Sequence, residues 1–368
     1  MKPRGAQVDC LIHKGDLRVT TTDDRAPRAL SDDQVRFTIE RFGLSANNIT
    51  YAVMGEAMRY WDFFPYAGLL GSQWRLMPVW GFATVAESNC NEVEVGERFF
   101  GYFPWSSELI VTPGRLDESG FSDVASHRAD LPTVYNRYAR CDFDPLYSVE
   151  AEPLVMLLRP LFITSFVVVD FFIDHDRFGA ATAIVSSASS KTAIGSALLL
   201  AELDGLEVVG LTSEANVEFC QSLGCYDRVL TYDQVHELDL VSSVYFDVAG
   251  RRDVTARIHH HFGDLLGWSM IIGDTHWDGP PSADEHLPGP KPELLFAPVQ
   301  IAKRRTQWGR EGFETAVGAA WERCLATFAS FIQIRTIVGT EAMLAAYAEL
   351  IDGQVDPTVG MICSFTPR

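Results

Sequence analysis

Cysteine is scarce in this sequence, and no cysteines have the spacing of a metal site. The seven cysteines of the 368-residue chain include no Cys-x-x-Cys pair. The N-terminal stretch MKPRGAQVDCLIHKGDLRV also lacks an apolar segment long enough for a signal peptide. An odd cysteine count without a secretion signal is expected of reduced thiols. We therefore predict a cytoplasmic protein that binds no metal.

Long apolar runs are also rare. The longest, PLVMLLRPLFITSFVVVDFFI, contains Arg159, Pro160 and Asp170. Charged side chains are costly inside a lipid bilayer, so a membrane helix would rarely hold two of them. We therefore predict a buried helix for this run, and no membrane contact.

Positive charge is in short supply. The chain has 30 Lys and Arg against 49 Asp and Glu, which gives a formal net charge of −19. Nucleic-acid binding needs clustered cations, so this balance excludes it as the main role. The most basic run, KRRTQWGR, is isolated. Its Lys303, Arg304 and Arg305 have two interpretations, a site for an anionic group or a solvated helix face.

Strand-like patterns fill the first part of the chain. Alternating apolar and polar residues, bounded by turns, predict strands within 34–45, 74–88, 95–104 and 106–113. Because no regular helices separate them, we predict an antiparallel or barrel-like domain at 1–150. An aromatic insert at 60–74 is either a core patch or the wall of a cleft for an apolar or aromatic small molecule.

The middle of the chain, 151–310, has a different character, because strands alternate there with helices. Strands are expected within 181–187, 206–212, 227–232, 241–250 and 265–274, with helices between them. This order predicts a parallel, doubly wound sheet with right-handed crossovers. The remainder, 311–368, shows two helices and a closing strand.

One segment of the middle region, TAIVSSASSKTAIGSALLLAEL, has the outline of a loop that wraps a phosphate. Small residues are needed there because the backbone approaches the phosphates at the start of a helix. Ser189, Thr192 and Gly195 occupy the three glycine positions of G-x-x-G-x-x-G, with Ala193 beside them. The hydroxyls of Ser189, Ser190 and Thr192 and the charge of Lys191 could bind phosphate. An ordinary strand-turn-helix is the alternative.

The end of the next strand bears on the choice of nucleotide. NAD-binding enzymes commonly place an acidic residue there to accept bonds from the ribose hydroxyls. Here the strand ends in Thr212 and Ser213, and Glu214 comes just beyond. Small hydroxyl residues leave space for a 2′-phosphate, which Lys191 could neutralise. The sequence thus favours NADP(H) over NAD.

The order of these segments resembles the medium-chain dehydrogenase/reductase superfamily, and within it the quinone-oxidoreductase and enoyl-reductase branch. The stretches PVWGFATVAES, VEVGERFFGYFPWSSELIVTP and FDVAG are similar to motifs of that branch. SSASSKTAIG, VVGLTS, GDTHWD, LPGPKPELLFAPVQIAKR and VDPTVG more closely resemble a family within it known only as a domain of unknown function. The resemblance implies an α/β chain with a GroES-like, β-rich catalytic domain, a Rossmann domain at 151–310, and 311–368 returning to the catalytic domain.

The same resemblance implies functional positions. Gly250, which ends FDVAG, and Gly273, which begins GDTHWDG, are expected to contact the cofactor through their backbones. Homodimers are common among such proteins, so a homodimer is expected. Zinc-dependent members have a Cys-and-Asp turn, a His-Glu pair and a four-cysteine lobe, whereas this chain has Asn47-Asn48, PVWGF and scattered cysteines. Because these residues cannot supply the usual ligands, we predict no catalytic zinc.

Without zinc, the protein must supply a proton and orient the substrate. Tyr51 is the first candidate because it follows the turn that faces the nicotinamide in the resembling enzymes; a packing role is the alternative. Asn48, with Asn47, could orient the substrate or simply make the turn. His276 is a candidate for proton transfer at the sheet's edge, or a residue that fixes its loop. In the run His259–His261, only one imidazole can face inward.

Three functional hypotheses follow from these patterns. The first is a zinc-independent, NADP(H)-dependent reductase of an activated carbonyl compound such as an enone or a quinone. The second keeps the nicotinamide cofactor but assigns a lyase or isomerase reaction without net redox change. The third is a nucleotide-binding sensor or partner protein without catalysis.

Overall fold

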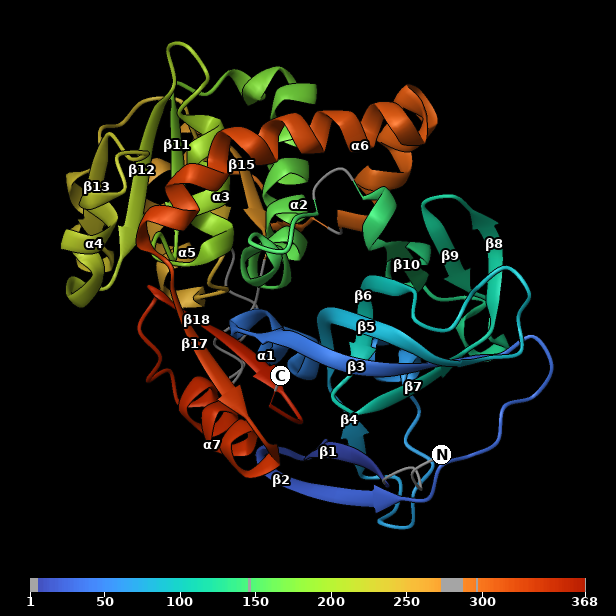
Figure 1. Ribbon diagram of the computed structural model, residues 1–368. Helices are drawn as coiled ribbons and strands as arrows, with labels where there is room; N and C mark the ends of the chain where they lie inside the picture. The colour runs from blue at the N-terminus through green and yellow to red at the C-terminus, as the bar shows by residue number, and fades with distance from the viewer. Residues whose placement is uncertain (1–5, 145–146, 273–286, 296, 368) are drawn as a thin grey trace. The chain divides into compact units, whose positions relative to one another are not determined.

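The computed structural model describes residues 6–144, 147–272, 287–295 and 297–367 (Figure 1). The chain divides into two compact units, which we call the first unit and the second unit. The first unit comprises Met1–Leu157 and Ile332–Arg368, and the second comprises Leu158–Phe331. Residues 311–331 therefore belong with the second unit, not with the C-terminal segment that the sequence predicts. They continue the helix α6 (Ala297–Phe331), which contacts α3 (Lys191–Leu200).

The first unit is built from antiparallel β-sheets, as predicted. In the described part of the chain, a three-stranded sheet has the order β2 (Asp16–Arg25), β1 (Gln7–His13), β4 (Trp74–Leu76). A nine-stranded sheet has the order β17 (Gln333–Val338), β18 (Val359–Ser364), β3 (Val35–Leu44), β5 (Pro78–Ser88), β6 (Arg98–Pro104), β10 (Arg137–Arg140), β9 (Gly120–Asp123), β8 (Pro113–Asp117), with β7 (Glu108–Val111) paired to β3. Only β17 and β18 are parallel neighbours among these described strands.

The end of the chain completes the first unit. β18 pairs antiparallel with β3, so that Met361 lies opposite Leu44. The preceding helix α7 (Thr340–Ile351) is fixed by Tyr347, whose hydroxyl donates to the carbonyl of Leu17 at 2.9 Å. The final segment thus returns to the β-rich domain, as the resemblance implied.

A short helix, α1 (Ala46–Val53), stands where the sequence analysis placed an Asn47-Asn48 turn. That expectation was wrong because Ser45 starts a helix here. Ser45 and Asn48 form a reciprocal capping box, in which each side chain binds the other residue's backbone N–H. Asparagine at this position replaces the usual Glu or Gln, which hides the helix start from a sequence pattern.

The second unit contains a parallel sheet, which confirms the predicted doubly wound arrangement. Among the described residues its order is β13 (Arg228–Thr231), β12 (Glu207–Thr212), β11 (Thr182–Ser186), β14 (Ser243–Asp247), β15 (Leu266–Ile271), β16 (Glu293–Leu294). All of these pairs are parallel. Helices α3, α4 (Val217–Ser222) and α5 (Arg252–Phe262) connect the strands (Figure 1).

The long apolar run forms α2 (Glu152–Asp174), with Pro160 inside the helix. By length and composition α2 could cross a membrane, but a core helix passes the same test, and 56% of its most apolar window is buried. Its Phe162 and Phe166 pack against aromatic rings of α6. These contacts agree with the predicted buried helix.

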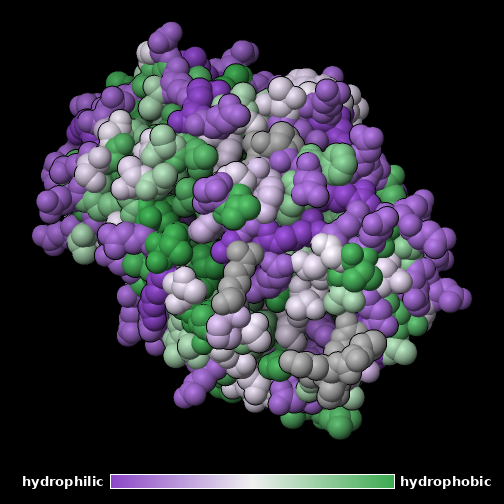
Figure 2. Space-filling model, in the orientation of Figure 1, coloured by the Kyte–Doolittle hydropathy of each residue, from purple (hydrophilic) through white to green (hydrophobic). Residues whose placement is uncertain are grey.

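The basic run agrees in part with a solvated helix face, because Lys303 is exposed and Arg305 is partly exposed, but its first two cations also pair with acids of α2. Arg304 is 8% exposed and binds Asp170 at 2.6 Å and Asp174 at 2.9 Å. Lys303 also binds Asp174, at 2.5 Å. These pairs join α6 to the end of α2. Elsewhere, the face in Figure 2 shows hydrophilic residues over much of the surface, with smaller apolar areas between them.

Candidate functional site

The carboxyl edge of the parallel sheet brings together the loops that follow β11, β12 and β14. The order places β11 between β12 and β14, so the connections diverge at this point, where ligands of open α/β sheets bind. The strand ends are tied to each other. The Ser186 hydroxyl donates to Asp247 Oδ1 at 2.9 Å and accepts from the Val248 N–H at 3.0 Å.

Asp247 is the centre of this hydrogen-bonded connection between the strand ends. Its carboxylate is 3% exposed and also accepts from the Thr255 hydroxyl at 2.9 Å and from the Gly250 N–H at 3.0 Å. Burial raises the pKa of Asp247, and the bonds from these donors oppose that rise. Gly250 has a φ of +68°, which a side chain would strain. The structure thus gives Gly250 a role in shaping the turn at this edge.

The loop after β11 presents polar groups at the start of α3. Ser187 has a φ of +51°, in the left-handed region that a glycine normally takes in such loops. Residues 189–192 are partly exposed, whereas the strand before them is buried. Ser190 caps the helix by accepting from the Ala193 N–H at 3.3 Å. Serine and threonine hydroxyls and the Lys191 ammonium therefore stand at a helix N-terminus, a donor set that fits a diphosphate.

Three of the predicted cofactor residues are buried and pack the protein instead. Ala193 is fully buried, and a Cβ added at Gly195 would lie 2.7 Å from Ser165 Oγ of α2. Gly195 therefore allows the two helices α3 and α2 to approach each other closely. Thr212 is 1% exposed and bonds to Cys220, which lowers the pKa of that thiol against the effect of burial.

The loops after β11 and β12 are joined by Asn216, which the sequence analysis did not single out. Its amide donates to Ser189 Oγ at 3.1 Å and to Ser213 Oγ at 3.2 Å. Ser213 itself is exposed at the end of β12. A hydroxyl-lined corner therefore lies where a dinucleotide ribose would sit.

Two further residues were also missed. The Tyr232 hydroxyl accepts from the Ser187 N–H at 3.2 Å, and Arg251 lies over the Tyr232 ring, 4.7 Å from its centroid. Tyr232 follows β13 directly and Arg251 lies four residues after β14, and these positions near the carboxyl ends of the strands were the available signal. Two predicted residues, Gly273 and His276, lie outside the described residues.

Tyr51 lies in the first unit, within a cluster of aromatic side chains. It is 5% exposed, and its ring centroid is 4.8 Å from that of Tyr60 and 5.3 Å from that of Tyr102. The indole N–H of Trp80 donates to its hydroxyl oxygen at 2.9 Å. Burial raises the pKa of Tyr51 far above its ordinary value, so the phenol stays protonated.

Asn48 and Asn47 both contribute to the structure around Tyr51. Asn48 Oδ1 accepts from the Ser45 N–H at 2.8 Å, and its amide donates to the Pro78 carbonyl at 2.9 Å. With Asn48 only 3% exposed, these bonds give it a structural role in joining α1 to β5. Asn47 bonds through its side chain to Tyr51 and lowers that pKa against the effect of burial.

The three consecutive histidines diverge around α5. His259 is fully buried, with Nδ1 2.9 Å from the Pro288 carbonyl and Nε2 2.9 Å from Ser269 Oγ. His260 is exposed, and His261 bonds to the Leu238 carbonyl at 2.8 Å. Within the described residues, no three His, Cys, Asp or Glu side chains are placed to hold a metal ion. All seven cysteines are described, and each is buried and free.

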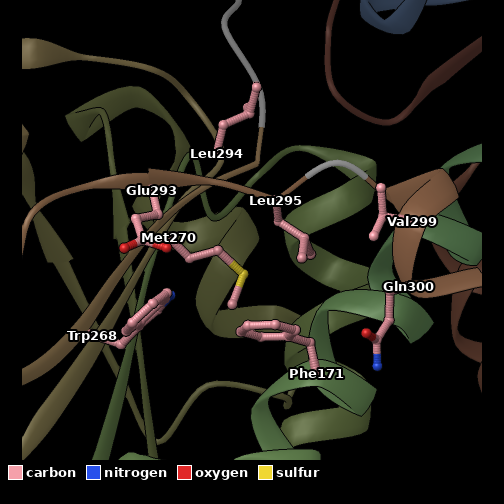
Figure 3. A pocket seen from close by; sticks show the side chains of 8 residues that line it. All are labelled: Phe171, Trp268, Met270, Glu293, Leu294, Leu295, Val299 and Gln300. Atoms are coloured by element: carbon pink, nitrogen blue, oxygen red, sulfur yellow. The ribbon is translucent and has the colours of Figure 1, made fainter. Parts of the chain in front are cut away.

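A separate pocket of about 240 Å³ lies on the β15–β16 side of the second unit (Figure 3). Figure 3 shows Phe171, Met270 and Leu295 reaching into it, with Glu293 and Gln300 among its polar residues. The complete lining is Phe171, Trp268, Met270, Glu293, Leu294, Leu295, Val299 and Gln300. None of these residues belongs to the loops at the carboxyl edge described above.

Comparison with known proteins identifies the family. No curated protein matches the sequence. Residues 42–356 match the model of a family described as "Protein of unknown function (DUF2855)". The chain belongs to this family. The family thus confirms the resemblance to a domain of unknown function.

Comparison with solved structures shows which known fold the DUF2855 chain shares. CurA in complex with NADPH from Vibrio vulnificus is 14% identical, with a TM-score of 0.62 over 98% of this chain and 99% of that one. The mitochondrial 2-enoyl thioester reductase Etr1p/Etr2p heterodimer from Candida tropicalis is 9% identical, with a TM-score of 0.60 over 98% and 100%. The yhdH oxidoreductase from Salmonella enterica in complex with NADP is 13% identical, with a TM-score of 0.52 over 97% and 99%. The DUF2855 chain thus has the medium-chain dehydrogenase/reductase fold, with GroES-like and Rossmann parts.

Proposed function

We propose that the protein is an NADP(H)-dependent reductase of an activated carbonyl compound, of the enone or quinone type. The observation that carries the proposal is the loop after β11, whose hydroxyls and Lys191 stand at the N-terminus of α3 at the sheet's switch point. The proposal is supported by the solved structures of similar fold, which include a CurA–NADPH complex, a yhdH–NADP complex and a 2-enoyl thioester reductase.

The residues of the second unit would hold the cofactor. Residues 189–192 would bind the diphosphate, and the exposed Ser213 leaves room for a 2′-phosphate. The cofactor, when bound, supplies a hydride. Hydride addition to a conjugated C=C leaves an enolate on the substrate, which needs a proton at carbon and a hydrogen-bond donor near oxygen.

Tyr51 is the residue that we assign to proton delivery. Its hydroxyl is protonated at neutral pH and so has a proton to give, although burial raises its pKa and makes it a weaker acid than a free phenol. The neighbouring Trp80 N–H donates to the same hydroxyl and would stabilise the phenolate that remains after the proton leaves. The metal-free reaction and the homodimer stay predictions.

Cofactor binding tests the proposal first. Titration with NADPH and NADH, followed by tryptophan fluorescence, should show NADPH binding that Lys191→Ala weakens by about tenfold, as expected for loss of a charge-assisted bond. Lys303→Ala is the matched control, because Lys303 pairs with Asp174 and should leave binding unchanged. An active protein should then oxidise NADPH in step with reduction of an enone or a quinone. Absence of binding to both nucleotides would contradict the proposal, and binding without turnover of any acceptor would favour a non-redox role.

A further inference from the structure

We propose that Trp80 is a positioning residue, which fixes the Tyr51 hydroxyl so that its proton points toward the substrate. This inference rests on the proposed function, because it gives Trp80 a part in the reductase reaction. The observation behind it is the bond between the Trp80 indole N–H and the Tyr51 oxygen, at 2.9 Å.

The bond is one of two that connect α1 to β5. Asn48 and Tyr51 are three residues apart on α1, so they lie on one face of the helix. Asn48 donates to the Pro78 carbonyl at the first residue of β5, and Trp80 comes two residues later on the same strand. The Asn48 bond thus fixes the position of α1 along β5. In that position, the Trp80 N–H lies within hydrogen-bond distance of the Tyr51 oxygen.

The chemistry of the donors fixes the direction of the phenol proton. An indole N–H can only donate, and a phenol oxygen accepts at most two hydrogen bonds. Trp80 provides one such donor to the Tyr51 oxygen. With its oxygen accepting from the indole, the Tyr51 O–H must direct its own proton away from Trp80. A rotatable hydroxyl is thereby converted into an oriented donor.

The ring of Trp80 has a separate, structural role. It stacks on Phe100, with centroids 5.6 Å apart, and lies 5.0 Å from Tyr102. Trp80→Phe keeps an aromatic ring in this place and removes the N–H. The matched control is Trp105→Phe, in the same unit, because the buried Trp105 indole nitrogen has no hydrogen-bond partner among the described residues.

A double-mutant cycle separates positioning from packing. Trp80→Phe should lower kcat by roughly 3- to 10-fold with KM unchanged, the effect of one neutral hydrogen bond. In the Tyr51→Phe background the same change should have no further effect, because the oxygen it orients is gone. Trp105→Phe should change kcat by the same factor in both backgrounds. Equal losses from Trp80→Phe in both backgrounds would overturn the positioning role.

A second measurement needs no turnover. In ¹⁵N spectra, the indole N–H of Trp80, assigned by its absence in Trp80→Phe, should move upfield in Tyr51→Phe as it loses its acceptor. An unmoved resonance would overturn the inference even in an active enzyme. Failure of the wild-type protein to turn over any acceptor would instead overturn the proposed function, so the two failures are distinguishable.

Discussion

The aromatic cluster around Tyr51 and the strand ends at the carboxyl edge of the parallel sheet are both buried, but they are held together by different forces. In the aromatic cluster, rings pack edge to face and hydroxyls have few partners. The buried Tyr102 hydroxyl, for example, has no hydrogen-bond partner among the described residues. At the carboxyl edge, the buried polar groups bond to each other, as Ser186, Thr255 and Gly250 do with Asp247.

This difference in packing and hydrogen bonding gives the side chains of the two regions different chemical properties. Burial among rings raises the pKa values of Tyr51, Tyr60, Tyr102 and Tyr135, so the cluster keeps its phenols protonated. At the carboxyl edge, bonded polar groups hold the loops, and the partly exposed residues 189–192 are left to meet an anion. Under the proposed function, the aromatic cluster would supply the proton and the carboxyl edge would bind the phosphates.

The largest expected effect comes from breaking the aromatic cluster. Phe63 is fully buried, with its ring centroid 5.5 Å from that of Tyr102 and 5.4 Å from that of Tyr135. Phe63→Ala should lower the free energy of unfolding of the first unit by about 3–5 kcal/mol, through lost burial and a cavity. Hydrogen exchange measured along the chain should show faster exchange in the first unit alone.

Phe143→Ala is the control for this change, because Phe143 is 54% exposed. It should shift stability by less than about 0.5 kcal/mol. Equal acceleration of exchange in both units after Phe63→Ala would contradict the view that each has its own core.

The comparison also explains what the sequence could predict. The three central strands of the parallel sheet, β11, β12 and β14, are nearly all buried, and they read as apolar runs between helices. The position of the serine-rich loop could be predicted because its strand, loop and helix are neighbouring residues in one segment. The same holds for α2, whose interrupted apolar run predicts a buried helix.

Other features depend on contacts between separate elements of the chain, which no local sequence pattern indicates. β2 is largely polar and β17 is largely exposed, so these strands exist through pairing with β1 and β18. The partners of Tyr51 come from separate elements, with Trp80 on β5 and Tyr102 on β6. Asn216 and Tyr232 likewise act across loops, which only the sheet order brings together.

A smaller effect should follow from adding a methyl group where α3 packs against α2, next to the loop after β11. Gly195→Ala places a Cβ 2.7 Å from Ser165 Oγ and 3.1 Å from Ser165 Cβ. We expect a loss of about 1–3 kcal/mol in the stability of the second unit, because α3 must move away from α2. Urea unfolding of the single variant would measure this loss. Adding Ser165→Ala should recover part of the loss by removing the nearer atom.

Gly312→Ala is the matched control on α6, where the added Cβ meets only Trp308 Cβ, at 3.2 Å. There the substitution should be neutral or stabilising, since alanine favours a helix over glycine by up to about 1 kcal/mol. If Gly195→Ala behaved in the same way, the close approach of α3 to α2 would not constrain position 195.

The smallest effect concerns pH and tests whether bonded polar groups in the second unit resist protonation. Burial lowers the pKa of His259 below its ordinary value of 6.5, so the folded protein holds this imidazole neutral. As pH falls below that value, the unfolded chain binds a proton that the folded one does not, and stability must decrease. The free energy of unfolding, measured between about pH 7.5 and 5, should decrease less steeply in His259→Gln than in the wild type.

His236→Gln, at an exposed side chain, should leave the wild-type slope of the free energy of unfolding against pH intact. Equal slopes in the wild type and His259→Gln would mean that the bonds to Pro288 and Ser269 tolerate the charged ring, and that this part of the unit is less closed to protons than its burial implies.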